Sequence, residues 1–312
     1  MTVVVSRPHV RDEADEFIRQ HVIDYGAVAD EERIRLQRQD VEDSIVRVPG
    51  ATDRVVVHDG HHVGVRVTRP AGQLRGVALD VHGGGWFTGR AAMNDQANAA
   101  LAQALDIAVV SVDYRLAPEW PFPAAVHDCT AAARWLLANA AAEFGTDRAV
   151  VIAESAGAQP ALLALLALRD EPEPSAAFCA AVFSYGVFDL SHTPSQRGAG
   201  AGPDVLNPAE IEFFTRLYLG ELSDERRPCR HVSPLYADFS GLPPALLMAG
   251  TADHFVDDSA FVAARWQRAN PGTQLVLYQD APHGAHHLPS ITPDWIARRN
   301  EFLAGRLEAA PE

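Results

Sequence analysis

The chain has 312 residues, a length typical of one large domain or two modest ones. Its hydrophobic fraction of 47% and charged fraction of 21% are those of a globular protein and exclude the disordered, collagenous and coiled-coil classes. Asp and Glu outnumber Lys and Arg by 41 to 26, and the resulting formal net charge of −15 repels phosphate backbones, so nucleic acid is not expected as a partner.

Three cysteines are spread along the chain without a C-x-x-C pair, at Cys129, Cys179 and Cys229. This usage favours a reducing compartment, so we expect a cytoplasmic protein with buried or inert thiols. The N-terminus has no basic stretch followed by a long apolar one, and the most apolar stretch, residues 156–168, is interrupted by Gln159-Pro160. Neither export nor a membrane span is expected.

The first part of the chain predicts helices followed by antiparallel strands. Residues 11–40 are highly charged with scattered apolar positions, which is typical of surface helices. Strand patterns follow at residues 44–48, 54–58 and 63–68, and the last two flank the turn-forming pair Asp59-Gly60. The first strands are therefore expected to be antiparallel.

From Gly76 onward, short apolar strands alternate with helices. The strand patterns are continuous apolar runs at residues 77–81, 107–112, 149–153, 180–184, 245–249 and 274–278. Helical patterns separate most of them, at residues 95–105, 124–138, 156–169, 257–267 and 294–307. Such alternation predicts an α/β fold with a mostly parallel sheet and helices on both faces.

Residues 191–230 interrupt this alternation. A Pro- and Gly-rich stretch leads into a capped helical pattern at residues 207–218. Long insertions on a rigid α/β scaffold often form lids or pocket walls, and a surface excursion without function is the alternative.

Residues 150–157, VVIAESAG, place a serine where a nucleophile would stand. A buried strand ends here, Ser155 lies in the turn, and a helix of small and apolar residues follows. This is the setting of the G-x-S-x-G nucleophile elbow, with Ala153 in place of the first glycine. Alanine adds one methyl group, so we expect the turn to form with slight strain. A helix N-cap is the alternative role for Ser155.

A second motif, H-G-G-G-W at residues 82–86, directly follows a buried strand. Successive glycines allow the backbone to approach a ligand and to direct N–H groups at it, as an oxyanion hole requires. A glycine-rich turn and a phosphate-binding loop are the alternatives, but no G-K-[ST] follows and no G-x-G-x-x-G opens a helix. His82 is expected to hold the loop by hydrogen bonds and not to act as a base.

With further motifs, these segments resemble the hormone-sensitive-lipase family of α/β-hydrolases, the bacterial esterases with the HGGG motif, over almost the whole chain. The motifs are HGGGW at residues 82–86, DYRLAPE at 113–119, FPAA at 122–125, ESAG at 154–157, SPL at 233–235, GLPP at 241–244, GTAD at 250–253 and HG at 283–284.

The resemblance implies an α/β-hydrolase fold, with an eight-stranded, mostly parallel sheet and a helical cap. The catalytic core would comprise residues 46–190 and 231–312. Residues 1–45 would supply N-terminal helices to the cap, and the inserted segment 191–230 would complete it.

The resemblance also assigns a catalytic triad, with Ser155 as nucleophile, Asp253 as acid and His283 as base. Their order along the chain is the one found in α/β-hydrolases. Asp253 and His283 each follow a predicted strand, and open α/β sheets assemble their sites at such carboxyl ends. Competing groups lie nearby: Asp257 and Asp258, expected to be solvated or to interact with a helix dipole, and His286 and His287, one turn past the loop.

Around the triad, the backbone N–H groups of Gly84, Gly85 and Ala156 would form the oxyanion hole. Candidates for substrate contacts are one residue beside the glycines and three on the inserted helix: Trp86, Phe213, Phe214 and Leu217. Packing of the cap onto the core is the alternative role of the helix residues. No metal and no organic cofactor is expected.

The chain departs from the family pattern without losing a catalytic group. Glycine is replaced by Ala153, the usual aspartate by Glu154, Pro-Leu by His254-Phe255, and phenylalanine by Ala285. The loss of bulk at Ala285 is expected to widen the pocket near the base. Arg115 and Glu119, in the DYRLAPE motif, are expected in a buried ion-pair or hydrogen-bond network.

These residues predict a serine carboxylesterase that hydrolyses small to medium acyl esters through an acyl-enzyme. The alternative is a dedicated deacetylase, lactonase, amidase or cyclase of small-molecule metabolism on the same scaffold. A non-catalytic ligand receptor is a third class, because similar receptors exist that have lost a triad member, and the presence of His283 argues against it. The expected partner is a small-molecule ester or related acyl substrate, and the chain is expected to be a monomer or homodimer.

Overall fold

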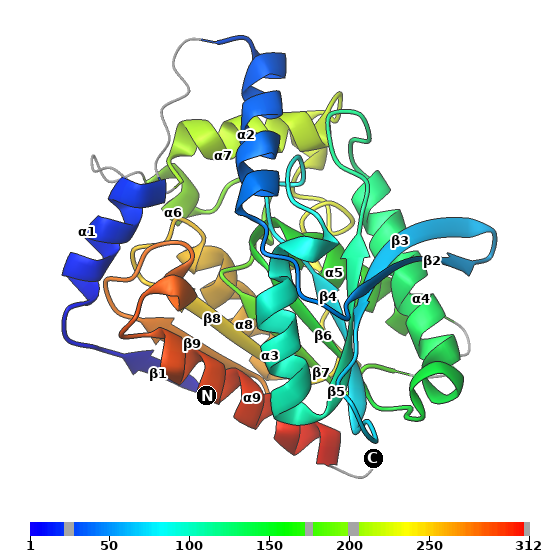
Figure 1. Ribbon diagram of the computed structural model, residues 1–312. Coiled ribbons are helices and arrows are strands. Elements are labelled where there is room, and N and C mark those ends of the chain that lie inside the picture. Colours follow the sequence, from blue (N-terminus) through cyan, green and yellow to red (C-terminus); the bar gives the residue numbers. More distant parts are fainter. Residues whose placement is uncertain (22–27, 172–176, 199–205, 309–312) are drawn as a thin grey trace.

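One sheet of nine strands runs through the described residues, 1–21, 28–171, 177–198 and 206–308, of this computed structural model (Figure 1). The strands are β1 (Thr2–Val5), β2 (Thr52–His58), β3 (His61–Thr68), β4 (Gly76–Val81), β5 (Ile107–Asp113), β6 (Ala149–Glu154), β7 (Ala180–Ser184), β8 (Ala245–Gly250) and β9 (Gln274–Tyr278). Their order is β1-β9-β8-β7-β6-β4-β5-β3-β2, and neighbours are parallel except in the β2–β3 and β3–β5 pairs. The predicted α/β class and antiparallel start are confirmed.

Two strand predictions are wrong. The sheet has nine strands and not eight, because residues 2–5 add a parallel strand beside β9; a run of four residues is too short to give a strand pattern. Residues 44–48 do not form a strand, since Ser44 ends helix α2 (Asp30–Ser44) and the following residues are irregular. Among the thiols, Cys129 is buried as expected, but Cys229 is exposed.

Except for the short helix α6, which was not predicted, the other helices lie close to their predicted positions. They are α1 (Val10–His21), α3 (Asp95–Leu105), α4 (Ala124–Phe144), α5 (Ala158–Arg169), α6 (Pro194–Arg197), α7 (Pro208–Leu219), α8 (Val256–Ala269) and α9 (Thr292–Glu308). Short 3₁₀ helices are η1 (Ala91–Asn94), η2 (Ser155–Gly157), η3 (Asp224–Arg226), η4 (Pro234–Tyr236) and η5 (Ala285–His287). In the part of the chain that the structure describes, no helix is both long and apolar enough to cross a membrane.

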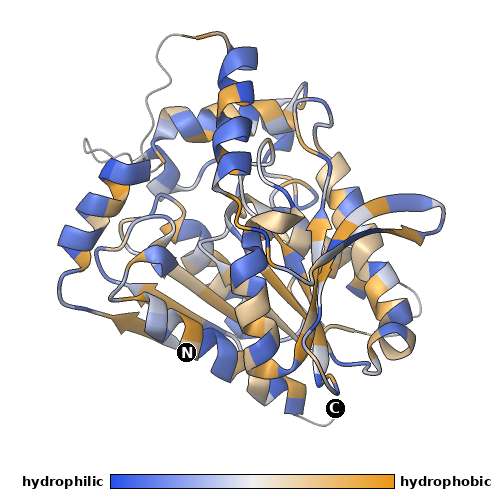
Figure 2. Ribbon diagram, in the orientation of Figure 1, coloured by the Kyte–Doolittle hydropathy of each residue, from blue (hydrophilic) through white to orange (hydrophobic). Residues whose placement is uncertain are grey.

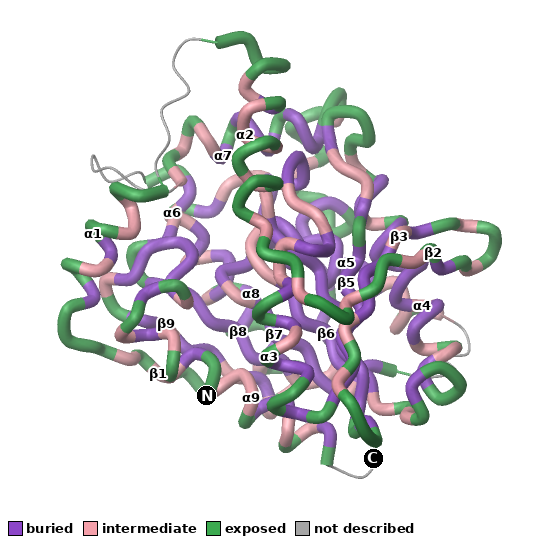
Figure 3. Tube along the Cα trace, viewed as in Figure 1, coloured by how far each residue is buried: buried purple, intermediate pink, exposed green. Residues whose placement is uncertain are grey.

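Alternate residues of the central strands face two hydrophobic cores. On β4, Val77 and Leu79 belong to the core that includes side chains of α4, α5 and α8, whereas Ala78 belongs to the core that includes side chains of α3 and α9. The central strands are hydrophobic (Figure 2) and buried along their length (Figure 3). With both faces covered by helices, the loops at the carboxyl ends of the parallel strands remain for the functional groups.

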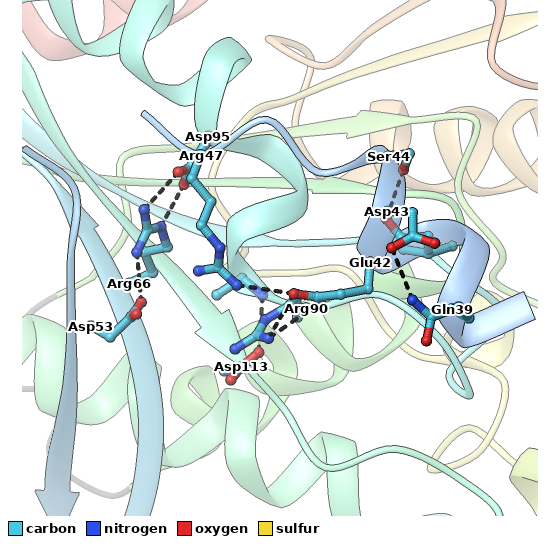
Figure 4. A network of polar contacts seen from close by, with 12 residues as sticks. Gln39, Glu42, Asp43, Ser44, Arg47, Asp53, Arg66, Arg90, Asp95 and Asp113 are labelled. Atoms are coloured by element: carbon cyan, nitrogen blue, oxygen red, sulfur yellow. Dashed lines mark hydrogen bonds and ion pairs between the residues drawn. The ribbon is translucent and has the colours of Figure 1, made fainter. Parts of the chain in front are cut away.

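A buried ion pair fixes the segment that joins α2 to β2 (Figure 4). Arg66 of β3 donates from Nε and Nη2 to both carboxylate oxygens of Asp95 on α3, at 2.6 and 2.7 Å. Asp95 also accepts the backbone N–H of Val48 at 2.8 Å, and Asp53 of β2 binds Arg66 Nη1 at 2.8 Å. The Asp95 side chain is 2% exposed and the Asp53 side chain 65% exposed, so the two carboxylates of this network lie in different environments.

A second polar group, Asp80 of β4, lies within the core at 3% exposure. Its carboxylate accepts hydrogen bonds from Ser111 Oγ at 2.7 Å and from Asn98 Nδ2 at 2.8 Å, which join β4 to β5 and α3. Burial raises the pKa of Asp80 to about 6, against the opposing effect of these donors. The folded protein therefore retains a proton here at pH values where the unfolded chain has released it.

Removing Asp95 should be much more costly than removing Asp53. Asp95→Ala leaves the Arg66 guanidinium buried without its main partner, and we expect the free energy of unfolding to fall by about 3–5 kcal/mol. Asp53→Ala removes an exposed partner of the same arginine and should cost less than about 1 kcal/mol. Urea unfolding of both variants measures the difference, and equal losses would contradict the assigned roles.

Asp80→Asn should change how stability depends on pH. Between about pH 4 and 6 the unfolded chain loses the Asp80 proton and the folded chain keeps it, so the wild type loses up to roughly 3 kcal/mol of unfolding free energy as pH rises. Asparagine does not titrate, so the stability difference between the variant and the wild type should shift in favour of the variant over this range. Urea unfolding at pH 4.5 and 7.5 tests this, with Asp53→Asn as the exposed control; a difference that does not change with pH would refute it.

Candidate active site

The turn after β6 places Ser155 in a strained position. Ser155 has a φ of +49°, in the left-handed region that side-chain-bearing residues rarely adopt, and its carbonyl accepts the N–H of Val187 at 3.0 Å. A Cβ at Gly157 would overlap the carbonyl oxygen of His82, so the turn requires glycine there. The same close approach brings Ser155 against the residues that follow β4.

The expected strain at Ala153 is not found. Ala153 is the second-last residue of β6, pairs with Val81 and Phe183 in the sheet, and is buried with an ordinary negative φ. The left-handed conformation falls on Ser155 instead, two residues later. The methyl group of Ala153 therefore fits the strand without distorting the turn.

Ser155, His283 and Asp253 form a continuous row of hydrogen bonds. The Oγ of Ser155 lies 3.0 Å from Nε2 of His283, and Nδ1 of His283 lies 3.1 Å from each carboxylate oxygen of Asp253. The Asp253 side chain is fully buried and also accepts the N–H of Phe255 at 2.9 Å. The carboxylate thus holds the imidazole with Nδ1 protonated and Nε2 free to accept a proton from Ser155.

Two aromatic rings hold the imidazole of His283. Phe255 and Tyr185 both meet it edge-on at 68°, with ring centroids 5.4 and 4.7 Å away. The hydroxyl of Tyr185 donates to Glu154 Oε2 at 2.7 Å and lies 2.9 Å from Nδ1 of His286. Burial lowers the pKa of His286 well below its usual range, which favours a neutral ring. Because the one hydroxyl proton of Tyr185 goes to Glu154, the Tyr185 oxygen is left to accept from Nδ1 of His286.

The competing acids and histidines have other contacts. Asp258 is fully buried, which excludes the first of its two expected roles, solvation, but it does lie in the first turn of α8, as an interaction with the helix dipole requires. It accepts four hydrogen bonds, from Phe188 N, Asp189 N, Thr193 Oγ1 and Gln196 Nε2. Asp257 accepts the N–H of Ser195 at 2.8 Å, and the ring of His287 stacks near Phe17 at 5.8 Å. The two aspartates therefore fix the segment 188–196 along its length.

The segment after β4, residues 82–90, is called here the glycine loop. Gly84 and Gly85 have φ of 103° and 58°, and their N–H groups, like that of Ala156, donate no hydrogen bond to any residue in the described ranges. Three free N–H groups beside the nucleophile are what stabilisation of an oxyanion requires. His82 is buried, and its Nδ1 lies 2.8 Å from the carbonyl oxygen of Gly83.

The aromatic candidates lie together over the glycine loop. Trp86 is fully buried and stacks on Tyr218 of α7, with centroids 4.4 Å apart and planes 8° apart. Phe214 packs on Gly85, where a Cβ would meet it at 3.1 Å, and Phe213 meets Phe87 edge-on at 5.7 Å. Leu217 is buried in the same core. All four candidates are thus placed in the packing between α7 and the body of the protein.

Two expectations about neighbouring residues are corrected. Arg115 and Glu119 do not share a buried network: Arg115 pairs with Asp128 at 2.8 Å, and Glu119, whose side chain is 55% exposed, pairs with Arg38 of α2. Ala285 is fully buried and does not widen an open pocket. The ring of Phe17 from α1 lies beside this position, 3.2 Å from where a Cβ of Gly284 would stand.

Sequence reasoning missed Tyr185, Asp258 and Arg38. Tyr185 follows β7 directly, and its position at a strand's carboxyl end is a signal that could have found it. Arg38 contacts Phe87, 49 residues later, and Asp258 contacts Thr193, 65 residues earlier, and no local pattern indicates either contact. Within the described ranges, no group of three or more His, Cys, Asp or Glu side chains is arranged to hold a metal ion.

Comparison with known proteins agrees with this geometry. A family model described as the alpha/beta hydrolase fold matches residues 78–287. The carboxylesterase NlhH of Mycobacterium tuberculosis (strain ATCC 25618 / H37Rv) is 36% identical over 224 residues, covering 70% of this chain and 68% of that protein. An ethyl acetate hydrolase of Pseudomonas putida is 32% identical over 288 residues, covering 87% of this chain and 88% of that protein.

Solved structures give the same result over nearly the whole chain. The crystal structure of an esterase from the bacterial hormone-sensitive lipase family superposes with a TM-score of 0.80 at 29% identity, covering 97% of this chain and all of that one. A mutant of the esterase E40 superposes with a TM-score of 0.79 at 30% identity, covering 96% of this chain and 99% of that one. The chain therefore belongs to the hormone-sensitive-lipase family of α/β-hydrolases.

Proposed function

We propose that this protein is a serine carboxylesterase that hydrolyses small to medium acyl esters. The observation that carries the proposal is the row of hydrogen bonds from Ser155 Oγ through His283 to the buried carboxylate of Asp253. Such a row activates a hydroxyl as a nucleophile, because the imidazole accepts its proton and the carboxylate stabilises the imidazolium that forms.

The reaction proceeds in two acyl transfers. Ser155 Oγ attacks the ester carbonyl carbon while its proton passes to Nε2 of His283, and the N–H groups of Gly84, Gly85 and Ala156 stabilise the oxyanion. His283 then protonates the departing alcohol, and an acyl-enzyme remains on Ser155. A water molecule, deprotonated by the same nitrogen, attacks the acyl carbon and releases the carboxylic acid and free Ser155.

The segments 1–45 and 191–230 are proposed to form a cap over a core of residues 46–190 and 231–312. Support comes from α2 and α7, which lie side by side (Figure 1) and are joined by the ion pair of Arg33 with Glu210. Phe214 of α7 contacts Gly85, so this cap would border the oxyanion hole. Trp86, Phe213, Phe214 and Leu217 are proposed as its apolar contacts with the substrate.

The substrate class rests on the relatives that are named carboxylesterase and ethyl acetate hydrolase. Both names describe hydrolysis of simple esters, and the partner we propose is accordingly a small-molecule ester. A cytoplasmic location and a monomeric or homodimeric state stay predictions, the former supported by the three free thiols.

Ser155→Ala should abolish ester hydrolysis while leaving the fold intact. Because the acyl-enzyme cannot form, kcat for p-nitrophenyl esters from acetyl to dodecanoyl should fall by about 10⁴-fold or more. Ser240→Ala, at an exposed serine far from the row of hydrogen bonds, is the matched control and should keep full activity. Circular dichroism confirms that both variants are folded.

A fluorophosphonate probe separates the remaining cases. A live triad forms a covalent bond between Ser155 Oγ and phosphorus with loss of fluoride, which mass spectrometry detects as an increment at Ser155. Labelling without turnover of any p-nitrophenyl ester would indicate a dedicated hydrolase with a narrower substrate, such as a lactone or an acetylated metabolite. Absence of both labelling and turnover would refute the proposed activity.

A further inference from the structure

The glycine loop contains one residue in a backbone conformation that its side chain disfavours. Gly84, Gly85 and Gly89 have φ of 103°, 58° and 92°, and Trp86, which carries a side chain, has a φ of 61°. Glycine adopts this region freely, whereas a residue with a side chain, such as Trp86, stays there only where surrounding contacts determine it. The contacts that hold the glycine loop therefore decide whether the N–H groups of Gly84 and Gly85 point at the reacting carbonyl.

Part of this support comes from the core. The N–H groups of Phe87 and Thr88 donate to the carbonyl of Gly84, at 3.2 and 3.0 Å, and the N–H of Ala117 donates to the carbonyl of Trp86 at 2.9 Å. The next carbonyl, that of Phe87, is held from outside the core. It accepts a hydrogen bond of 2.8 Å from Nε of Arg38 on α2.

The guanidinium of Arg38 joins three acceptors. Besides the carbonyl of Phe87, it donates from Nη2 to the carbonyl of Ala117 at 2.8 Å. Glu119 accepts from Nη1 and Nη2 at 2.8 and 2.7 Å, which fixes the plane of the guanidinium. Only a planar fork of donors can reach these acceptors together, so lysine cannot replace arginine here.

Helix α2 is itself held in place on both sides of this contact. Near its start, Arg33 pairs with Glu210 and lies over the ring of Phe213, 3.9 Å from the ring centroid. Near its end, Glu42 contacts Arg90, the last residue of the glycine loop, at 3.3 Å (Figure 4). Helix α2 therefore contacts the glycine loop at two residues, Phe87 and Arg90, so a shift of the helix would move the loop.

We propose that Arg38 is a positioning residue that couples the docking of helix α2 to the geometry of the oxyanion hole. The inference rests on the proposed function, since it concerns the same reaction. Arg38 has no contact with the triad; it fixes the peptide between Phe87 and Thr88, and through it the direction of the N–H groups of Gly84 and Gly85.

Arg38→Ala should lower kcat for p-nitrophenyl acetate by about tenfold or more with little change in KM. A misdirected N–H group weakens binding of the transition state and leaves binding of the ground state unchanged, so kcat and kcat/KM fall together. Arg38→Lys keeps the charge but not the fork and should show most of the same loss. Inhibition by a trifluoromethyl ketone, whose hemiketal oxygen occupies the oxyanion hole, should weaken by the same factor as kcat/KM.

Arg35→Ala is the matched control. Arg35 lies one turn earlier on α2, its side chain is 60% exposed, and it pairs with Glu32 of the same helix. The same charge is removed from the same helix, but the glycine loop is untouched, so kcat should stay within about twofold of the wild type. Combining Arg38→Ala with Glu119→Ala should cost no more than Arg38→Ala alone, because Glu119 acts through Arg38.

The outcomes distinguish the inference from the function it rests on. If Arg38→Ala and Arg38→Lys both keep the kcat of Arg35→Ala, or if they raise only KM, the positioning role is overturned. The proposed esterase activity is not affected by that result. If the wild type neither hydrolyses esters nor reacts with the fluorophosphonate, the proposed function and the positioning role are both refuted. If Arg38→Ala does not fold, kcat of Arg38→Lys and of Glu119→Gln is compared with that of Arg35→Ala instead. Glu119→Gln is expected to lower kcat less than Arg38→Lys does.

Discussion

The whole site depends on a close contact between the ends of β4 and β6. These strands are neighbours, and Gly157, just past the end of β6, lies so near the carbonyl of His82 that no side chain fits between them. This approach forces the left-handed turn at Ser155 and sets Ser155 beside Gly83, whose Cβ would stand 3.1 Å from that of Ser155. One backbone contact thus places the hydroxyl and the glycine loop together before any side chain of the triad takes part.

The other half of the site uses the same kind of contact between β8 and β9. A Cβ at Gly250, the last residue of β8, would overlap the carbonyl of Ala281, and the N–H of Ala252 donates to that carbonyl at 3.0 Å. Asp253 directly follows Ala252, and His283 lies two residues after Ala281. Their separation is therefore fixed by the backbone, and the rings of Tyr185 and Phe255 have only to set the orientation of the imidazole.

The sequence predicted what is local and missed what depends on distant partners. Most strands and helices, the nucleophile turn and the glycine loop each have a pattern within a dozen residues, and the structure contains them where they were expected. Asp253 and His283 were selected through the family resemblance, because a lone aspartate or histidine after a strand carries no pattern of its own. The burial of Asp258 did not follow from the sequence, since it is decided by the segment 188–196, more than 60 residues before it. Strand β1 was missed because four residues show no periodicity.

The placement of β1 has a consequence for how the chain acquires its structure during synthesis. Thr2 pairs with Leu275, so β1 has no partner until synthesis has passed β9, more than 270 residues later. Contacts this far apart in sequence form slowly, and an unpaired apolar strand can meanwhile associate with other chains. The valines at positions 3–5 therefore stay unpaired for longer during synthesis than the residues of any other strand in the described sheet.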